Sequence, residues 1–209
     1  MQSDYLQPEF YRFSQDSIYL ASKASQLFST YFSTYSCDQI KILDLAAGCG
    51  VVGLEFIQKI KCQRELEKIV SLDFLEAQEA FIPFLAKNID WVRSHFKNNI
   101  KMSILHQSFQ TFSDERYNFV ISNPPYFEED SGLLPFEMKR RMARFFHDSS
   151  FAEYLYSLGR ILLPGGIAVF LNCKEKVRLT VLHSTPWLEV LSVDESQVGA
   201  NLFVVQALC

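Results

Sequence analysis

Short apolar runs that alternate with helix-like stretches constrain the fold of this chain more than any other feature of its sequence. Five runs have the length and composition of buried parallel strands, at residues 40–45, 68–73, 101–106, 117–122 and 166–172. Two stretches, at residues 51–62 and 76–88, carry apolar side chains at three- and four-residue spacing and are predicted helices. Ser150 and Glu153 form a capping-box pattern that predicts a third helix through Leu162. This alternation predicts an α/β fold with a doubly wound, mostly parallel sheet covered by helices on both faces.

The two ends of the chain extend this plan. Apolar runs at residues 189–193 and 202–208 have no helical stretch between them. They predict a hairpin and an antiparallel last strand, which completes a seven-stranded Rossmann-like sheet. Before the first strand, residues 16–31 have a helical pattern with an apolar face. We expect this segment to form a short N-terminal helical cap over the strand ends.

The composition restricts the class of protein. A chain of 209 residues that is 48% hydrophobic and 21% charged has the size of one globular domain. A formal net charge of −4 argues against coating nucleic acid through bulk charge. A basic signal-peptide start and an apolar run of about 20 residues are both missing, so we expect a cytoplasmic protein. Five cysteines without a C-x-x-C pair and four scattered histidines predict reduced thiols and no metal.

The loop after the first expected strand is a candidate ligand-binding element. Residues 44–50 read Asp-Leu-Ala-Ala-Gly-Cys-Gly, and ligands of doubly wound sheets bind at the carboxyl ends of the strands. Gly48 and Gly50 permit a tight turn and a close approach of the backbone to a ligand. Ala46 stands where a dinucleotide fingerprint has its first glycine, which argues against a pyrophosphate ligand. A tight turn without any ligand is the alternative.

Asp73 is the second candidate, because it ends the second expected strand. A carboxylate there can accept hydrogen bonds from both hydroxyls of a ribose, a contact shared by nicotinamide cofactors and S-adenosylmethionine. The alternative is an acid that caps the following helix. The chain has no further phosphate-binding loop, so the distinction between the cofactors depends on the motif after the fourth strand.

The fourth expected strand runs directly into Asn123-Pro124-Pro125-Tyr126. An amino group conjugated to a ring is a poor nucleophile because its lone pair is delocalised. The Asn123 side-chain carbonyl and the Pro124 backbone carbonyl can each accept one of its N–H bonds and direct the lone pair at a methyl sulfonium. The prolines preorganise both acceptors, while Tyr126, with Phe127 beside it, offers a flat face for stacking. The motif thus predicts methyl transfer to a planar amino nitrogen; a proline-rich turn without function is the alternative.

On these residues the chain resembles the class I S-adenosylmethionine-dependent amino-methyltransferases that carry an Asn-Pro-Pro-Tyr motif. The resemblance implies an N-terminal cap segment at residues 1–37 and a class I methyltransferase domain at residues 38–209. It also implies that S-adenosylmethionine is held by Asp44, Ala46, Gly48, Gly50, Asp73 and Asn123. The acid that these enzymes often carry after the third strand is missing here, and Gln107 or Ser108 stands in its neighbourhood.

Residues 11–21, Tyr-Arg-Phe-Ser-Gln-Asp-Ser-Ile-Tyr-Leu-Ala, are similar to the N-terminal segment of bacterial enzymes that methylate adenine N6 in valine tRNA. This similarity, shared by Met142-Ala143-Arg144, implies that Asp16 lies near the methionine end of the cofactor and that the substrate is tRNA. A loop base would be exposed and stacked against the motif residues Pro125, Tyr126 and Phe127. Phosphate contacts would come from the cations Lys139, Arg140, Arg141 and Arg144. A solvated helix face is the alternative for this basic run.

Two other functions remain open. Glutamine methyltransferases of release factors share the motif but normally carry a long helical domain before the sheet, whereas the first strand here is expected at residue 40. A non-catalytic S-adenosylmethionine-binding module would not need two acceptors and a stacking ring. DNA methyltransferases usually add a target-recognition domain, for which this length leaves no room. We expect a monomer that acts on RNA.

Overall fold

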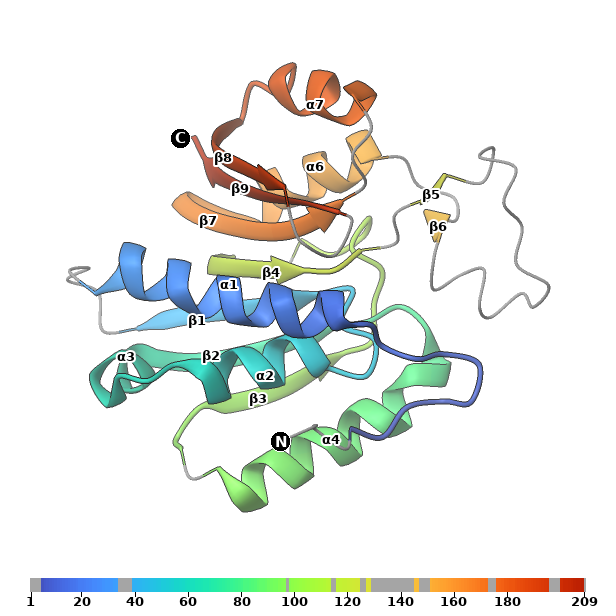
Figure 1. Ribbon diagram of the computed structural model, residues 1–209, viewed down its shortest axis with the longest axis vertical. Helices are drawn as coiled ribbons and strands as arrows, with labels where there is room; N and C mark the ends of the chain where they lie inside the picture. Colours follow the sequence, from blue (N-terminus) through green and yellow to red (C-terminus); the bar gives the residue numbers. More distant parts are fainter. Residues whose placement is uncertain are drawn as a thin grey trace.

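A computed structural model describes residues 5–33, 39–96, 98–113, 116–124, 127–128, 145–146, 151–172, 176–195 and 200–208. Seven strands form one twisted sheet in the order β3-β2-β1-β4-β7-β9-β8 (Figure 1). Their bounds are β1 Ile40–Leu45, β2 Ile69–Leu75, β3 Lys101–Leu105, β4 Tyr117–Ser122, β7 Leu162–Asn172, β8 Leu188–Glu195 and β9 Asn201–Ala207. Strand β9 is antiparallel to both of its neighbours, β7 and β8. The predicted doubly wound sheet with an antiparallel last strand is confirmed.

Helices cover both faces of this sheet. On one face lie α1 (Gln15–Phe32), α2 (Val51–Lys59) and α4 (Ile82–His95), whose buried residues share one apolar cluster with the sheet. On the other face, α6 (Phe151–Ile161) and α7 (Lys176–His183) contribute to a second cluster. The short α3 (Gln63–Lys68) precedes β2, and a 3-10 turn (Glu79–Phe81) precedes α4. The sheet is therefore the middle of three layers.

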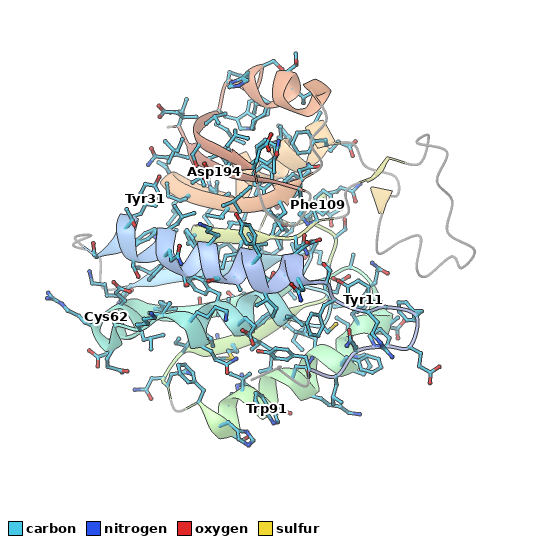
Figure 2. The ribbon with its side chains drawn as sticks, in the orientation of Figure 1. Tyr11, Tyr31, Cys62, Trp91, Phe109 and Asp194 are labelled. Atoms are coloured by element: carbon cyan, nitrogen blue, oxygen red, sulfur yellow. The ribbon has the colours of Figure 1, made fainter. Side chains whose placement is uncertain are left out.

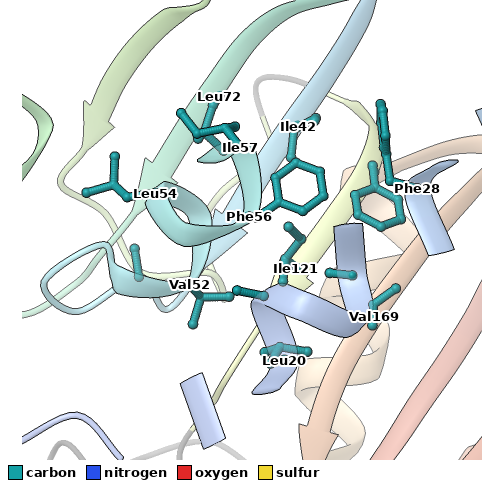
Figure 3. Packing of buried hydrophobic residues seen from close by; sticks show 14 of the residues in the cluster. Leu20, Phe28, Ile42, Val52, Leu54, Phe56, Ile57, Leu72, Ile121 and Val169 are labelled. Carbon is teal, nitrogen blue, oxygen red and sulfur yellow. The ribbon is translucent and has the colours of Figure 1, made fainter. Parts of the chain in front are cut away.

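The N-terminal helix was predicted correctly, but its position differs from the expected one. Helix α1 lies on the face of the sheet beside α2 (Figure 1) and does not cap the strand ends. Its apolar stripe packs against strand residues, as seen for Leu20 and Phe28 near Ile121 and Val169 (Figure 3). The Phe28 ring also meets Phe56 edge-on, with centroids 5.5 Å apart. Burial of this stripe on the sheet removes more apolar surface from water than a cap over the polar strand ends would.

Several element boundaries differ from the expected ones. Strand β2 continues through Phe74 and Leu75, which are both buried. The helix expected from residue 76 starts with the 3-10 turn at Glu79 and continues to His95. Helices α3 and α7 were not predicted, because their six and eight residues are too short to display a helical apolar pattern.

A second, two-stranded sheet follows the Asn-Pro-Pro-Tyr motif. Its strands β5 (Phe127–Glu128) and β6 (Phe145–Phe146) pair in parallel, with Phe127 opposite Phe145. The residues after the motif are thereby joined to the residues that follow the basic run. Pro125, Tyr126 and the cations Lys139, Arg140, Arg141 and Arg144 lie outside the described residues. In the described part of the chain, no helix is long and apolar enough to cross a membrane.

Candidate active site

The carboxyl ends of four strands are fastened together at one edge of the sheet. The Ser122 hydroxyl at the end of β4 donates to the Leu45 carbonyl at the end of β1, with 2.7 Å between the oxygens. The Ala47 amide donates to the Leu75 carbonyl of β2 at 3.0 Å, and the Glu76 amide to the Leu105 carbonyl of β3 at 3.1 Å. The loops that follow these strands therefore start from a fixed framework, which is what a preorganised site requires.

The glycine loop between β1 and α2 turns through left-handed backbone conformations. The φ angles are +60° at Ala46, +54° at Gly48 and +80° at Gly50. A Cβ atom on Gly50 would lie 2.5 Å from the buried Leu85 side chain, so this glycine also permits close packing against α4. A Cβ on Gly48 would meet no atom of the described residues within 4 Å. Ala46 tolerates a conformation that side chains rarely adopt, and such strain is typical of functional loops.

Substitution of the two glycines should have unequal effects on stability. Both Gly48→Ala and Gly50→Ala introduce left-handed strain, but only Gly50→Ala also forces a methyl group into Leu85. We expect Gly50→Ala to lower the free energy of unfolding by about 3 kcal/mol and Gly48→Ala by about 1 kcal/mol. Urea unfolding without added ligand measures both values. Equal losses would contradict the close approach to α4.

Asp44, at the end of β1, is fully buried beneath the glycine loop. Its Oδ2 atom accepts a hydrogen bond from the Gly53 amide at 2.8 Å, while Oδ1 has no hydrogen-bond partner among the described residues. Burial raises the pKa of this carboxyl to about 8, partly offset by the Gly53 amide and reinforced by the charge of Glu76. Asp44 therefore fastens the start of α2 to β1 and does not line the pocket described below.

This buried carboxyl should make the stability depend on pH. Asp44 ionises near pH 4 in the unfolded chain and near pH 8 in the folded one, so between these values the folded state binds the extra proton. We expect the free energy of unfolding to fall as the pH rises from 5 to 8, with Glu76 acting in the same direction. Asp44→Asn keeps an acceptor for Gly53 and should reduce the fall, as measured by urea unfolding at both pH values. An identical fall in both proteins would refute this assignment.

Glu76, the first residue after β2, is the acid that the structure places beside the glycine loop. Its side chain is only 5% exposed. Its Oε2 atom accepts a hydrogen bond from the Gly48 amide at 2.7 Å, and Oε1 accepts one from the Gln78 amide at 2.7 Å. Burial raises the pKa of Glu76, while these backbone donors and the nearby His106 lower it. The carboxylate thus links the carboxyl ends of β1 and β2.

Asp73 does not end β2, so the expected position of this acid at the strand end is wrong. It lies inside the strand opposite Leu43, and its Oδ2 atom accepts a hydrogen bond from the Tyr117 hydroxyl at 3.1 Å. Leu43 and Tyr117 both belong to the apolar cluster on the α6 side of the sheet. The apolar pair Phe74-Leu75, which continues the strand to Glu76, is the sequence signal that could have located the acid at the end of β2.

The glycine loop, the end of β4 and the N-terminal segment enclose one small pocket. Its lining consists of Tyr11, Phe13, Ser17, Ala46, Ala47, Gly48, Cys49, Val51, Val52 and Asn123. Asn123 is partly buried, and its Nδ2 atom donates to the Ser17 hydroxyl at 3.2 Å. Pro124 beside it is buried. Ala46, Gly48 and Asn123, which were expected to share a site, are thus brought together.

The N-terminal segment before α1 is held against α2 and α4. The Tyr5 hydroxyl donates to Glu55 at 3.1 Å and accepts from Gln58 at 2.8 Å. Asn88 of α4 bonds both backbone groups of Leu6 and also donates to the Cys49 carbonyl, each at 2.9 Å. Tyr11 lies on this segment at the carboxyl edge of the sheet (Figure 2), 5.2 Å from the Phe81 ring centroid to centroid.

Other expected residues are not part of the pocket lining. Asp16 lies in the first turn of α1, next to the lining residue Ser17. The Ser108 hydroxyl donates to the Gln110 side chain at 2.6 Å inside a turn after β3. Gly50 acts by packing against Leu85. Tyr11, Phe13, Ser17 and Glu76 were not predicted as site residues. The aromatic character of residues 11–13 was the sequence signal available for Tyr11 and Phe13.

Comparison with known proteins places this chain in a family. A family model described as "Lysine methyltransferase" matches residues 14–131. The tRNA1(Val) (adenine(37)-N6)-methyltransferase of Tolumonas auensis is 29% identical over 143 residues, covering 68% of this chain and 55% of that protein. The enzyme of the same name from Dyadobacter fermentans is 32% identical over 130 residues, covering 62% of this chain and 49% of that protein. The chain thus spans about half the length of these curated relatives.

Solved structures agree with the fold. A protein of Listeria monocytogenes described as a class I S-adenosylmethionine-dependent methyltransferase superposes with a TM-score of 0.68 at 16% identity, covering 98% of this chain and 64% of that one. TrmN from Thermus thermophilus superposes with a TM-score of 0.54 at 14% identity, covering 91% of this chain and 52% of that one. The family model extends from the residue before α1 through the glycine loop and the Asn-Pro-Pro-Tyr motif, and the chain therefore belongs to the methyltransferase family that this model describes.

Proposed function

We propose that this protein transfers the methyl group of S-adenosylmethionine to an exocyclic amino nitrogen, with adenine N6 of tRNA as the substrate. The observation that carries the proposal is the position of Asn123, which lines the same pocket as Ala46 and Gly48 of the glycine loop. A methyl donor held by the loop and an amino group held by Asn123 would therefore share one small space. The curated relatives named as tRNA adenine-N6 methyltransferases support this choice of substrate.

The residues at the strand ends fit S-adenosylmethionine, which supplies a methyl group on a sulfonium. Glu76 is the acid that would accept hydrogen bonds from the ribose hydroxyls, a role that the sequence predicted for Asp73. The Glu76 carboxylate already accepts hydrogen bonds from the Gly48, Gln78 and Ala77 amides, and two carboxylate oxygens together have room for about four. The Gly48 position leaves the space that close approach of a ligand needs, while Tyr11 and Phe13 would cover the ligand.

Asn123 and Pro124 would act on the amino group of the substrate. The carboxamide oxygen of Asn123 and the carbonyl of Pro124 would each accept one N–H, which directs the nitrogen lone pair at the methyl carbon. The amine becomes acidic only as the methyl group arrives, so the reaction needs no strong base. Tyr126, Pro125 and Phe127 would stack the base, and Asp16 and Ser108 remain proposed as contacts of the cofactor. Asp44 and Gly50 would act indirectly, by holding the glycine loop in place.

The substrate RNA would lie along the segment that follows the motif. Strand β5 begins directly after Tyr126, and β6 directly follows Arg144, so the pairing of Phe127 with Phe145 joins the basic run to the motif. Lys139, Arg140, Arg141 and Arg144 would contact phosphates near the flipped base. The protein as a whole carries a net charge of −4, which repels RNA. Attraction of the RNA phosphates would therefore depend on this local group of cations.

The description of the matching family favours a second candidate, the side-chain amine of lysine in a protein. Lysine carries a charged ammonium near neutral pH and must lose a proton before it can attack. The adenine amino group is uncharged and planar, so two carbonyl acceptors suffice to orient it. The described pocket offers Asn123 but no carboxylate in its lining, which favours the uncharged substrate.

The substrate can be identified with labelled S-adenosylmethionine. The protein is incubated separately with unmodified tRNA, DNA, release factor and a mixture of lysine-rich proteins, and the product is located by mass spectrometry. We expect label on adenine N6 of tRNA. Label on lysine or glutamine would replace the proposed substrate, and cofactor binding without any transfer would leave the protein as a binding module.

A further inference from the structure

The N-terminal segment, residues 5–13, lines the same pocket as the glycine loop, through Tyr11 and Phe13. The Tyr11 amide donates to the Pro8 carbonyl at 3.1 Å. The Phe13 amide donates to the Gln7 side-chain oxygen at 2.9 Å, so the segment holds its own shape. Figure 1 shows it running from beside α4 to the start of α1. The place of Tyr11 and Phe13 at the pocket therefore depends on how the start of the segment is held.

Asn88 of α4 joins the start of this segment to the glycine loop. Its side chain is 2% exposed. Its Oδ1 atom accepts a hydrogen bond from the Leu6 amide, and Nδ2 donates to the Leu6 and Cys49 carbonyls, each at 2.9 Å. A backbone amide can only donate and a carbonyl can only accept, so these partners permit one orientation of the carboxamide. One buried side chain with a determined orientation thus connects the segment, the glycine loop and α4.

The segment also contacts the loop after β2, through Phe81 in the 3-10 turn. Phe81 is 2% exposed, and its ring meets the rings of Phe10 and Tyr11 edge-on, with centroids 5.6 and 5.2 Å apart. Glu76 begins the loop that leads to this turn. The Tyr5 hydroxyl anchors the beginning of the segment on α2. The segment therefore packs against both of the loops that would hold S-adenosylmethionine.

We propose that Asn88 is a positioning residue that couples the N-terminal segment to the glycine loop, so that S-adenosylmethionine binding and docking of residues 5–13 stabilise each other. A ligand between the glycine loop and Tyr11 contacts both only when the segment is docked. The ligand then favours docking by the same factor by which docking raises the affinity. The proposal rests on the part of the proposed function that places the cofactor at the glycine loop, and it holds for any methyl acceptor.

Trypsin measures docking of the segment directly. Arg12 is exposed and is the only lysine or arginine before Lys23, so cleavage after it reports on this segment. When detachment and redocking are fast, the cleavage rate follows the detached population. We expect saturating S-adenosylmethionine to slow cleavage after Arg12 about tenfold in the wild type and less than about twofold in Asn88→Ala. By calorimetry, Asn88→Ala should raise the Kd for S-adenosylmethionine about tenfold.

Two further variants separate coupling from general destabilisation. Asn98→Ala makes the same chemical change in the turn before β3, where the side chain also bonds backbone groups, and should keep the wild-type Kd and protection. Tyr5→Phe removes the hydroxyl that bonds Glu55 and Gln58 on α2. Tyr5 does not line the pocket, so its effect on the cofactor must pass through the segment. We expect Tyr5→Phe to raise the Kd about two- to threefold and to weaken the protection of Arg12.

The outcomes distinguish the coupling from the site on which it depends. Equally fast cleavage after Arg12 with and without the cofactor in the wild type would overturn the coupling. So would a wild-type Kd in both Asn88→Ala and Tyr5→Phe, and if Asn88→Ala did not fold, the Kd of Tyr5→Phe would decide. Failure of the wild type to bind S-adenosylmethionine would instead reject the proposed cofactor site, and the coupling with it.

Discussion

Asn123→Ala should lower kcat by about 100-fold or more while the Kd for S-adenosylmethionine stays within about twofold of the wild-type value. The side chain lines the pocket next to the glycine loop, and its removal takes away one of two acceptors aimed at the substrate amine. Loss of one preorganised polar group of this kind costs on the order of 3 kcal/mol of transition-state stabilisation. Single-turnover methylation and calorimetry with the cofactor measure the two quantities.

Asn98→Ala is the matched control for this substitution. Asn98 lies in the turn before β3, where it donates to the Phe96 carbonyl and accepts from the Ile100 amide. It should reduce stability slightly and leave kcat unchanged. If Asn123→Ala retained the wild-type rate, the motif would be a structural turn and the amino-group chemistry would have to be abandoned.

Glu76→Gln should weaken binding of S-adenosylmethionine about 10- to 100-fold. Hydrogen bonds to a charged group contribute roughly 1.5–3 kcal/mol, and the amide would replace one acceptor oxygen by a donor beside the ribose. It would also place a donor against the Gly48 or the Gln78 amide, both of which now donate to the carboxylate. Calorimetric titration with S-adenosylmethionine measures the change directly.

Asp73→Asn is the control that distinguishes the two acids. It makes the same chemical change three residues earlier, where the side chain bonds Tyr117 on the opposite side of the sheet from α2. We expect it to leave the cofactor Kd unchanged. The reverse outcome, weak binding in Asp73→Asn and normal binding in Glu76→Gln, would return the ribose role to Asp73.

The pattern of apolar residues was enough to predict the sheet, because buried parallel strands need continuous apolar runs and the helices between them need an apolar face. The same pattern predicted the closing hairpin of β8 and β9, which is confirmed. The same pattern did not predict the correct end of β2, where the local sequence is ambiguous. The polar Asp73 interrupts an apolar run, so the strand was expected to end there, although a buried hydrogen bond to Tyr117 allows it to continue.

The sequence by itself determined the main alternation of strands and helices along the chain and the residue types of the two loops, because glycine, proline and asparagine impose their conformations and hydrogen-bonding groups locally. Tertiary structure alone decided which acid stands beside the glycine loop and which hydroxyl contacts Asn123. Both depend on contacts between distant segments: Glu76 with Gly48, and Ser17 with Asn123. Such contacts follow from how α1 and the strands pack on one another, and no local pattern of residues encodes which distant segments come into contact.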